Sequence, residues 1–167
     1  LSIGLKSIGF KKGDVLALIG DNKPEWVFFE IACHANGGMS LGVYRDTLDD
    51  EVGYLVKSAK VKFAYAEDQE QVDKLINVQK KLKTKIKVIY DDPRGLEKLK
   101  NPNVINMKDL ASVGKKQLNK NNKVYENLIN QVPGETVSVL CTTSGTTSNP
   151  KLAMLPANKF INHISNY

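Results

Sequence analysis

The sequence predicts an α/β fold with a mostly parallel sheet flanked by helices. Short apolar runs alternate along the chain with segments whose apolar residues recur at helical spacing. The apolar runs are continuous, which is typical of strands buried on both faces of a parallel sheet. With 167 residues, of which 41% are apolar and 25% charged, the chain is long enough for one globular core.

Buried strands are expected at four places in the first half of the chain, namely 15–19, 39–44, 61–66 and 86–90. Turn-forming residues bound these runs, as Gly20-Asp-Asn22 does after the first. A further run at 136–141 predicts a last strand, which enters a segment made almost entirely of hydroxyl residues and glycine.

Amphipathic helices are expected between these strands. Pro24 suits the first turn of the first helix, with Asp21 and Asn22 as cap candidates, and 36–38 ends it. Thr47 is the cap candidate of the second helix, whose apolar stripe is Leu48, Val52, Leu55, Val56 and Ala59.

The pattern continues through a third helix and weakens only after the fourth strand. Asp68 is the cap candidate of a third helix, whose apolar residues are Val72, Leu75, Ile76 and Leu82. A turn is expected at 91–95, a helix at 108–118 and a loop at 119–123.

The net charge of +6 is concentrated in the middle of the chain. Fourteen of the 24 basic residues, but only four of the 18 acidic ones, lie between Lys74 and Lys123. Only Arg45 and Arg94 are arginines, and no series of aromatic side chains is interleaved with the lysines for base stacking. This composition favours a solvated surface, so no nucleic-acid partner is expected.

Cellular location is predicted from what the sequence lacks. No apolar run approaches the roughly 18 to 20 residues of a spanning helix, and no signal peptide is recognised. Cys33 and Cys141 form no metal-binding spacing with His34 or His163, so no metal ligands are assigned. Two thiols without a secretion signal fit a reducing compartment. We therefore expect a cytoplasmic protein, with peripheral association on the inner face of a membrane left open.

The segment 142–151 has the composition of a phosphate-binding loop. Gly145 allows backbone N–H groups to turn toward an anion, and Lys151 supplies a mobile positive charge. Hydroxyl donors come from Thr143, Ser144, Thr146 and Thr147. A Walker-type loop is excluded, because Pro150 and Leu152 occupy places that need glycine and a hydroxyl residue. A flexible Ser/Thr linker is the alternative, although such linkers rarely follow a buried strand directly.

The run Thr143-Ser-Gly-Thr-Thr-Ser-Asn-Pro-Lys151 closely resembles the phosphate-binding signature of the adenylate-forming (AMP-binding) synthetases, Thr-Ser-Gly-Thr-Thr-Gly-x-Pro-Lys-Gly. Ser148 and Leu152 replace two glycines of that signature. Upstream, 13–26 resembles an early strand and helix start of this family. Residues 38–44 and 66–71 resemble segments of its long-chain acyl-CoA synthetase branch.

This resemblance implies that 1–167 belongs to the large N-terminal AMP-binding domain of a fatty acid–CoA ligase and ends just after the phosphate-binding loop. The whole enzyme would activate a long-chain fatty acid as acyl-AMP and transfer it to coenzyme A, with ATP, Mg²⁺ and coenzyme A as co-substrates. The residues expected to hold the β- and γ-phosphates are Thr143, Ser144, Gly145, Thr146, Thr147 and Lys151. None of them would act as nucleophile, acid or base.

Two further expectations follow from the same resemblance. The chain starts at Leu1 and lacks the family's later motifs, so it is interpreted as a piece of a longer protein that is inactive alone. Two alternative functions are kept: an acyl-adenylating enzyme that loads a carrier protein, and a non-catalytic phosphate- or nucleotide-binding module. Acyl chain length and oligomeric state are not predicted.

Overall fold

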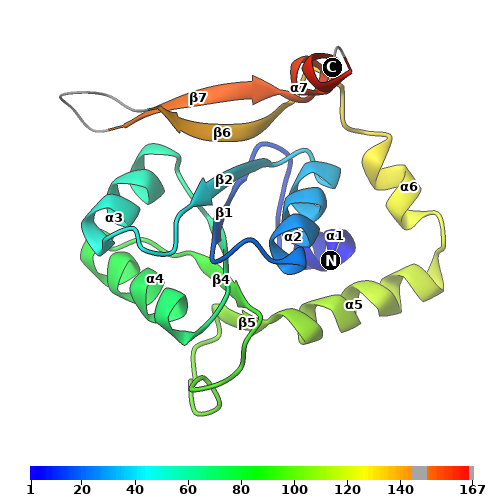
Figure 1. The fold of residues 1–167 in the computed structure, drawn as a ribbon. Coiled ribbons are helices and arrows are strands. Elements are labelled where there is room, and N and C mark those ends of the chain that lie inside the picture. The colour runs from blue at the N-terminus through cyan, green and yellow to red at the C-terminus, as the bar shows by residue number, and fades with distance from the viewer. Residues whose placement is uncertain (144–149, 166–167) are drawn as a thin grey trace.

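The computed structural model describes residues 1–143 and 150–165, which form a seven-stranded sheet flanked by helices (Figure 1). The order across the sheet is β5-β4-β3-β1-β2-β6-β7. Neighbouring strands are parallel except for the last pair, β6 and β7, which is antiparallel. The strands are β1 (Val15–Ile19), β2 (Met39–Val43), β3 (Phe63–Ala66), β4 (Lys87–Tyr90), β5 (Val104–Asn106), β6 (Val137–Thr143) and β7 (Lys151–Pro156).

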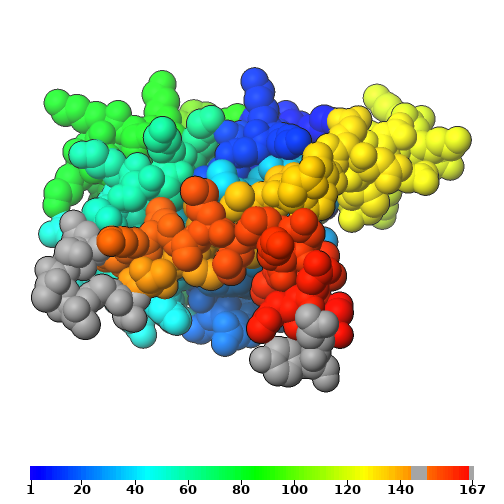
Figure 2. All heavy atoms as spheres, turned by 90° about the horizontal axis from the view of Figure 1, so that it is seen from above, coloured from blue at the N-terminus to red at the C-terminus, as the bar shows by residue number. Residues whose placement is uncertain are grey.

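Helices cover both faces of the central strands. On one face lie α3 (Asp49–Ser58) and α4 (Gln69–Leu82), and on the other lie α1 (Ser2–Ser7), α2 (Pro24–Ala35) and α5 (Met107–Lys120). The helices α6 (Val124–Ile129) and α7 (Ala157–Ile164) flank the last two strands in the chain. Seen from above, β7 and α7 lie on the outer surface of the molecule (Figure 2). Among the described residues, no helix combines the length and apolar character that crossing a membrane requires.

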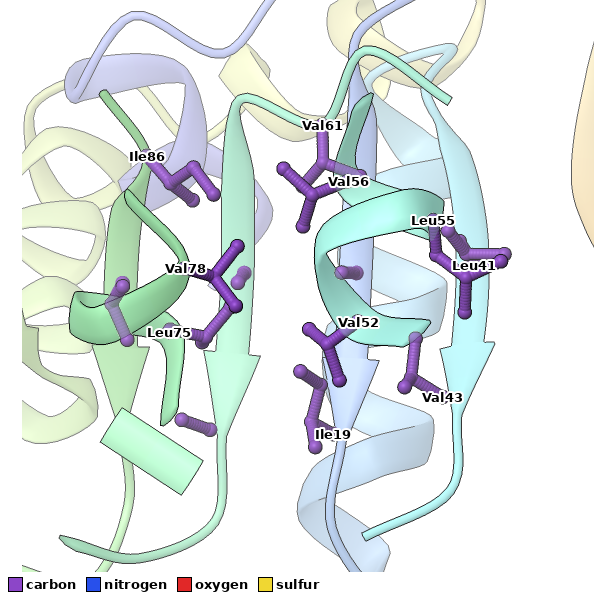
Figure 3. Close-up of a cluster of buried hydrophobic side chains, with 14 of the residues drawn as sticks. Ile19, Leu41, Val43, Val52, Leu55, Val56, Val61, Leu75, Val78 and Ile86 are labelled. Carbon is purple, nitrogen blue, oxygen red and sulfur yellow. The ribbon is translucent and has the colours of Figure 1, made fainter. Parts of the chain in front are cut away.

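The strand β1 explains why the apolar runs in this sequence are continuous. Its side chains alternate, so that Val15, Ala17 and Ile19 face α3 and α4 while Leu16 and Leu18 face α2. Figure 3 shows the first of these two cores, where Val52 of α3 points toward Ile19 and Leu55 lies beside Leu41. Since both sides of the strand are buried, neither can be polar, and the mostly parallel sheet predicted from these runs is confirmed.

The second core, beneath α2, is packed through aromatic rings and one essential glycine. Phe29 of α2 stacks on Tyr65 of β3 with ring centroids 4.7 Å apart, and Phe10 lies 4.9 Å from Phe63. A Cβ on Gly38 would lie 2.4 Å from the Phe10 ring, closer than real Cβ contacts allow. The chain between α2 and β2 therefore passes this ring only because residue 38 has no side chain.

The expected strands at 15–19, 39–44, 61–66, 86–90 and 136–141 are all present, with ends that shift by at most two residues. Asp68 caps α4 as expected, and its carboxylate accepts a hydrogen bond from the Gln71 N–H at 3.1 Å. The short elements α1, β5 and α6 carry too few residues to show a periodicity in the sequence.

Three local expectations are wrong. Thr47 does not cap α3, whose N-cap is Leu48, and the first turn instead carries Asp49, Asp50 and Glu51, which stabilise the positive end of the helix. Neither Asp21 nor Asn22 caps α2, which begins after Lys23. The expected loop at 119–123 is shorter, because α5 continues through Lys120.

The Leu48 and Leu55 side chains, both assigned to one apolar stripe, lie in opposite environments. Leu55 is 3% exposed and Leu48 is 76% exposed. We expect Leu55→Ala to lower the free energy of unfolding by about 2–5 kcal/mol, because it removes buried contacts and leaves a cavity. The matched Leu48→Ala change should stay within about 0.5 kcal/mol. Urea unfolding of both variants measures this, and equal losses would contradict the packing described above.

Candidate functional site

The carboxyl ends of the parallel strands form the edge at which this fold can build a site. The chain passes to α2 on one face after β1 and to α3 on the other face after β2. Diverging connections of this kind leave a crevice outside the strand ends, where ligands of open α/β sheets bind. A cavity of about 370 Å³ lies there, lined by Trp26 and Glu30 of α2, Tyr44 after β2, and Cys141 and Thr142 of β6.

The predicted phosphate loop joins β6 to β7 beside this crevice. Thr143 and Lys151 lie directly opposite each other in the antiparallel pair, and the Thr143 Oγ1 donates to the Lys151 carbonyl at 3.3 Å. Thr143 and Lys151 are therefore brought together at the base of the loop. Four further predicted residues lie outside the described residues: Ser144, Gly145, Thr146 and Thr147.

Two features of the loop base bear on anion binding. Lys151 is exposed, and its ammonium makes no hydrogen bond or ion pair with any residue in 1–143 or 150–165 that the structure records. The Tyr54 hydroxyl of α3 donates to the Pro150 carbonyl at 3.0 Å. Tyr54 thus fixes the chain at the point where it leaves the predicted loop, a contact that no pattern in the sequence indicates.

A buried carboxylate ties the connections after β1 and β3 together. Glu67, only 5% exposed, accepts from the Asp21 N–H at 2.6 Å and forms an ion pair with Lys23. This hydrogen-bonded pairing raises the pKa of the Lys23 ammonium. A Cβ on Gly20 would lie 2.7 Å from the Glu67 Cβ, so glycine is required for this approach.

Arg45 adds the connection after β2 to the same network. Its guanidinium lies 2.7 Å from the Asp21 carboxylate and 3.4 Å from that of Asp68, and its carbonyl accepts from Lys74 Nζ at 2.6 Å. The Asp21 carboxylate accepts a hydrogen bond from Arg45, and α2 has no side-chain cap. Sequence reasoning missed this network, although Asp21, Arg45 and Glu67 each follow a predicted strand by no more than two residues.

A polar cluster lies between α2 and the sheet, at the base of the crevice. The Ser40 hydroxyl, in a residue only 1% exposed, lies 3.1 Å from Glu30 Oε1 and 3.3 Å from the Ser138 carbonyl, either of which can accept its proton. His34 Nε2 lies 3.1 Å from the same hydroxyl. Burial lowers the pKa of His34, so its imidazole is held neutral at pH 7.

Comparison with known proteins identifies relatives over almost the whole chain. The family model described as AMP-binding enzyme matches residues 1–167. The human long-chain-fatty-acid–CoA ligase ACSBG1 is 30% identical over 158 residues, which cover 91% of this chain and 20% of that protein. The rat long-chain-fatty-acid–CoA ligase 5 is 30% identical over 155 residues, covering 90% and 22%. The chain thus spans about a fifth of the length of these curated relatives.

Solved structures share the fold at lower sequence identity. The luciferase-like enzyme of the mealworm Zophobas morio aligns with a TM-score of 0.72 and 13% identity over 98% of this chain and 35% of its own. The anthranilate CoA ligase AuaEII, solved with anthranoyl-AMP, aligns with a TM-score of 0.70 and 14% identity over 99% of this chain and 28% of its own. These likenesses confirm the α/β fold expected from the sequence.

The half-buried imidazole of His34 makes the free energy of unfolding depend on pH. Its folded pKa lies below the unfolded value of about 6.5, so the unfolded chain binds more protons in the interval between the two values. The contribution of His34 is complete above the unfolded pKa and is lost as the pH falls through the folded one. Urea unfolding should therefore show a larger loss of stability between about pH 7.5 and about pH 5.5 for the native chain than for His34→Gln.

Equal pH dependence in the native chain and in His34→Gln would contradict a half-buried, neutral imidazole at residue 34.

Proposed function

The chain belongs to the AMP-binding enzyme family, and we propose that it is part of an ATP-dependent ligase that activates a long-chain fatty acid as acyl-AMP and transfers it to coenzyme A. Residues 1–167 are then part of its N-terminal AMP-binding domain. The observation that carries the proposal is the position of Thr143 and Lys151, the two ends of the predicted phosphate loop, at the carboxyl edge of the sheet. The long-chain-fatty-acid–CoA ligases among the relatives support the choice of substrate.

The chemistry of the first step determines what this loop has to do. A carboxylate oxygen of the fatty acid attacks the α-phosphorus of ATP, and the bond from that phosphorus to pyrophosphate breaks. Hydroxyl and backbone N–H donors with a nearby ammonium orient the pyrophosphate and neutralise the charge that develops on it. Thr143 and Lys151, at opposite sides of the loop base, have the donor types that this task requires.

Mg²⁺ and coenzyme A enter the proposal as co-substrates. Mg²⁺ keeps several waters and binds through substrate phosphates, so the protein needs few ligands of its own. In residues 1–143 and 150–165 no three His, Cys, Asp or Glu side chains gather as a metal site. In the second step the coenzyme A thiol attacks the acyl carbonyl and AMP leaves. The expected location of this chemistry is the cytoplasm.

The family also allows the acyl group to pass to a carrier protein, which is the alternative acceptor. The two acceptors are distinguished by measuring AMP release from the whole protein, with fatty acid and ATP present, in the presence and absence of coenzyme A. Strong stimulation by free coenzyme A supports the ligase. A non-catalytic module would release no AMP under either condition.

Lys151 tests the proposed role of the loop directly. We expect Lys151→Ala in the whole protein to slow acyl-adenylate formation by about 10²- to 10³-fold, because a preorganised charge facing the leaving group is lost. Lys151→Arg should recover only part of the rate, since a fixed guanidinium fork does not reproduce a compact ammonium. Thr146→Val, which removes a hydroxyl at nearly constant shape, tests a loop position outside the described residues in the same way.

The measurement is pre-steady-state formation of the acyl-adenylate, with fatty-acid affinity determined in parallel. Lys159→Ala, an exposed lysine on α7, is the matched control and should leave the rate unchanged. An unaltered rate in Lys151→Ala would exclude this loop from the reaction.

Tyr54 is a positioning residue for the same loop. Tyr54→Phe removes the hydrogen bond to the Pro150 carbonyl and keeps the ring. A neutral hydrogen bond contributes about 0.5–1.5 kcal/mol, so adenylation should slow by about two- to tenfold, with fatty-acid affinity unchanged. Tyr125→Phe on α6 is the matched control. Adenylation at the native rate in Tyr54→Phe would show that this contact does not position the loop.

A further inference from the structure

Five lysines surround a cavity at the amino edge of the sheet, opposite to the edge that carries the phosphate loop. The cavity measures about 550 Å³ and lies where α3 and α4 end and the chain enters β3 and β4. Its lysines are Lys57, Lys60, Lys62, Lys81 and Lys85, and we call it the lysine cavity. Figure 3 shows Val56 and Val61, two of its apolar lining residues, together at one end of the core.

The positive charge of the lysine cavity is only partly compensated. Lys62 pairs with Asp14 at 2.7 Å, and Lys81 pairs with Asp50. The ammonium groups of Lys57, Lys60 and Lys85 have no hydrogen bond or ion pair with the described part of the chain, and the cavity lining includes no acidic residue. Three unpaired cations around one cavity repel one another, and a multiply charged anion removes that repulsion.

Only two of these five lysines lie where a helix end favours a positive charge. Lys57 and Lys81 lie in the last turns of α3 and α4, where a cation stabilises the negative end of a helix. Lys62 and Lys85 lie outside the helices, in the connections to β3 and β4. Stabilisation of helix ends therefore does not explain why Lys62 and Lys85 lie beside Lys57 around the cavity.

Lys60 has a backbone conformation that disfavours a side chain. Its φ is 54°, in the left-handed region just beyond the end of α3, a position that usually carries glycine. Lys83, with a φ of 52° at the end of α4, shares this conformation but does not line the cavity. The two residues therefore form a matched pair, of which only one contributes charge to the cavity.

We propose that the lysine cavity binds a phosphate-bearing anion, with an apolar portion lying in the adjoining groove. The ammonium group binds phosphate as a compact point charge, and several such groups suit a ligand with more than one negative charge. A groove of about 290 Å³ between α3 and α4 shares Lys57, Lys81 and Leu82 with the cavity and continues along Gly53 and Val78. Its far end carries Asp49 and Asp50, of which Asp50 pairs with Lys81, so the charged group of the ligand belongs in the cavity and only its apolar portion in the groove. This chemistry belongs to lipid headgroups and to soluble phosphate esters.

The test uses the 167-residue chain and two probes. Inositol hexakisphosphate, followed by titration calorimetry at low salt, represents a soluble phosphate. Phosphatidylcholine vesicles with and without phosphatidic acid, followed by co-sedimentation, represent a lipid headgroup. Binding of either probe supports the site and identifies the source of the phosphate. Absence of binding to both probes would overturn the proposal, as would stronger binding to an oligonucleotide than to both.

Substituting glycine for Lys60 and for Lys83 distinguishes the effect of lost charge on binding from the effect of relieved backbone strain on stability. Lys60→Gly and Lys83→Gly should both raise the Tm, by about 2–4 °C, because glycine adopts the left-handed conformation without strain. Only Lys60→Gly should weaken binding of the probe, by about fivefold. Equal affinities in the two variants would overturn the assignment of Lys60 to the site.

A triple substitution in the lysine cavity should give a larger loss of binding, and a second triple substitution on α5 controls for the change in net charge. Lys57→Gln, Lys60→Gln and Lys85→Gln together should weaken binding by about a hundredfold. Lys115→Gln, Lys116→Gln and Lys120→Gln on α5 make the same change in net charge on another face and should leave binding nearly unchanged. Equal losses in both triple variants would show that overall charge, and not the lysine cavity, attracts the anion.

Discussion

The buried carboxylate of Glu67 is the constraint on which the carboxyl edge of the sheet depends. An unpaired charge in this position would be costly, so the carboxylate requires the Lys23 ammonium and the Asp21 N–H, and both come from the connection after β1. The missing side chain of Gly20 allows that approach. Through Asp21 the same connection reaches Arg45, which follows β2. One buried charge thereby holds together the connections after β1, β2 and β3, which form one side of the crevice.

The crevice also depends on a pairing between distant parts of the chain. The register aligns Ser40 of β2 with Val139 of β6, although β3, β4, β5 and four helices lie between these two strands in the chain. This return places Cys141 and Thr142 in the crevice lining and the base of the phosphate loop next to α3. The polar cluster of His34, Ser40 and Glu30 lies along the same pair of strands. Its mutual hydrogen bonds satisfy the Ser40 hydroxyl, which the β2–β6 pairing removes from water.

The two anion sites proposed above lie at opposite edges of the sheet and differ in kind. At the carboxyl edge, hydroxyl residues and one lysine follow a strand on a local loop, which suits a ligand whose phosphates must be oriented for reaction. At the amino edge, lysines from four separate segments surround an apolar floor, which supplies charge without a fixed donor geometry. The basic middle of the sequence was interpreted as a solvated surface. Only Lys81 and Lys85 of the lysine cavity come from that stretch, and their partners come from residues 57–62.

The sequence by itself determined the features that depend on neighbours along the chain. Continuous apolar runs identified the buried strands, Asp68 identified a helix start, and the hydroxyl-rich run with Lys151 predicted a phosphate-binding loop. Only the tertiary structure decided that Leu48 is exposed while Leu55 is buried, that Glu67 is paired with Lys23, and where the lysines gather. Local periodicity and capping involve contacts within a few residues, whereas strand order and ion pairs join segments that are brought together only by burial of the two cores.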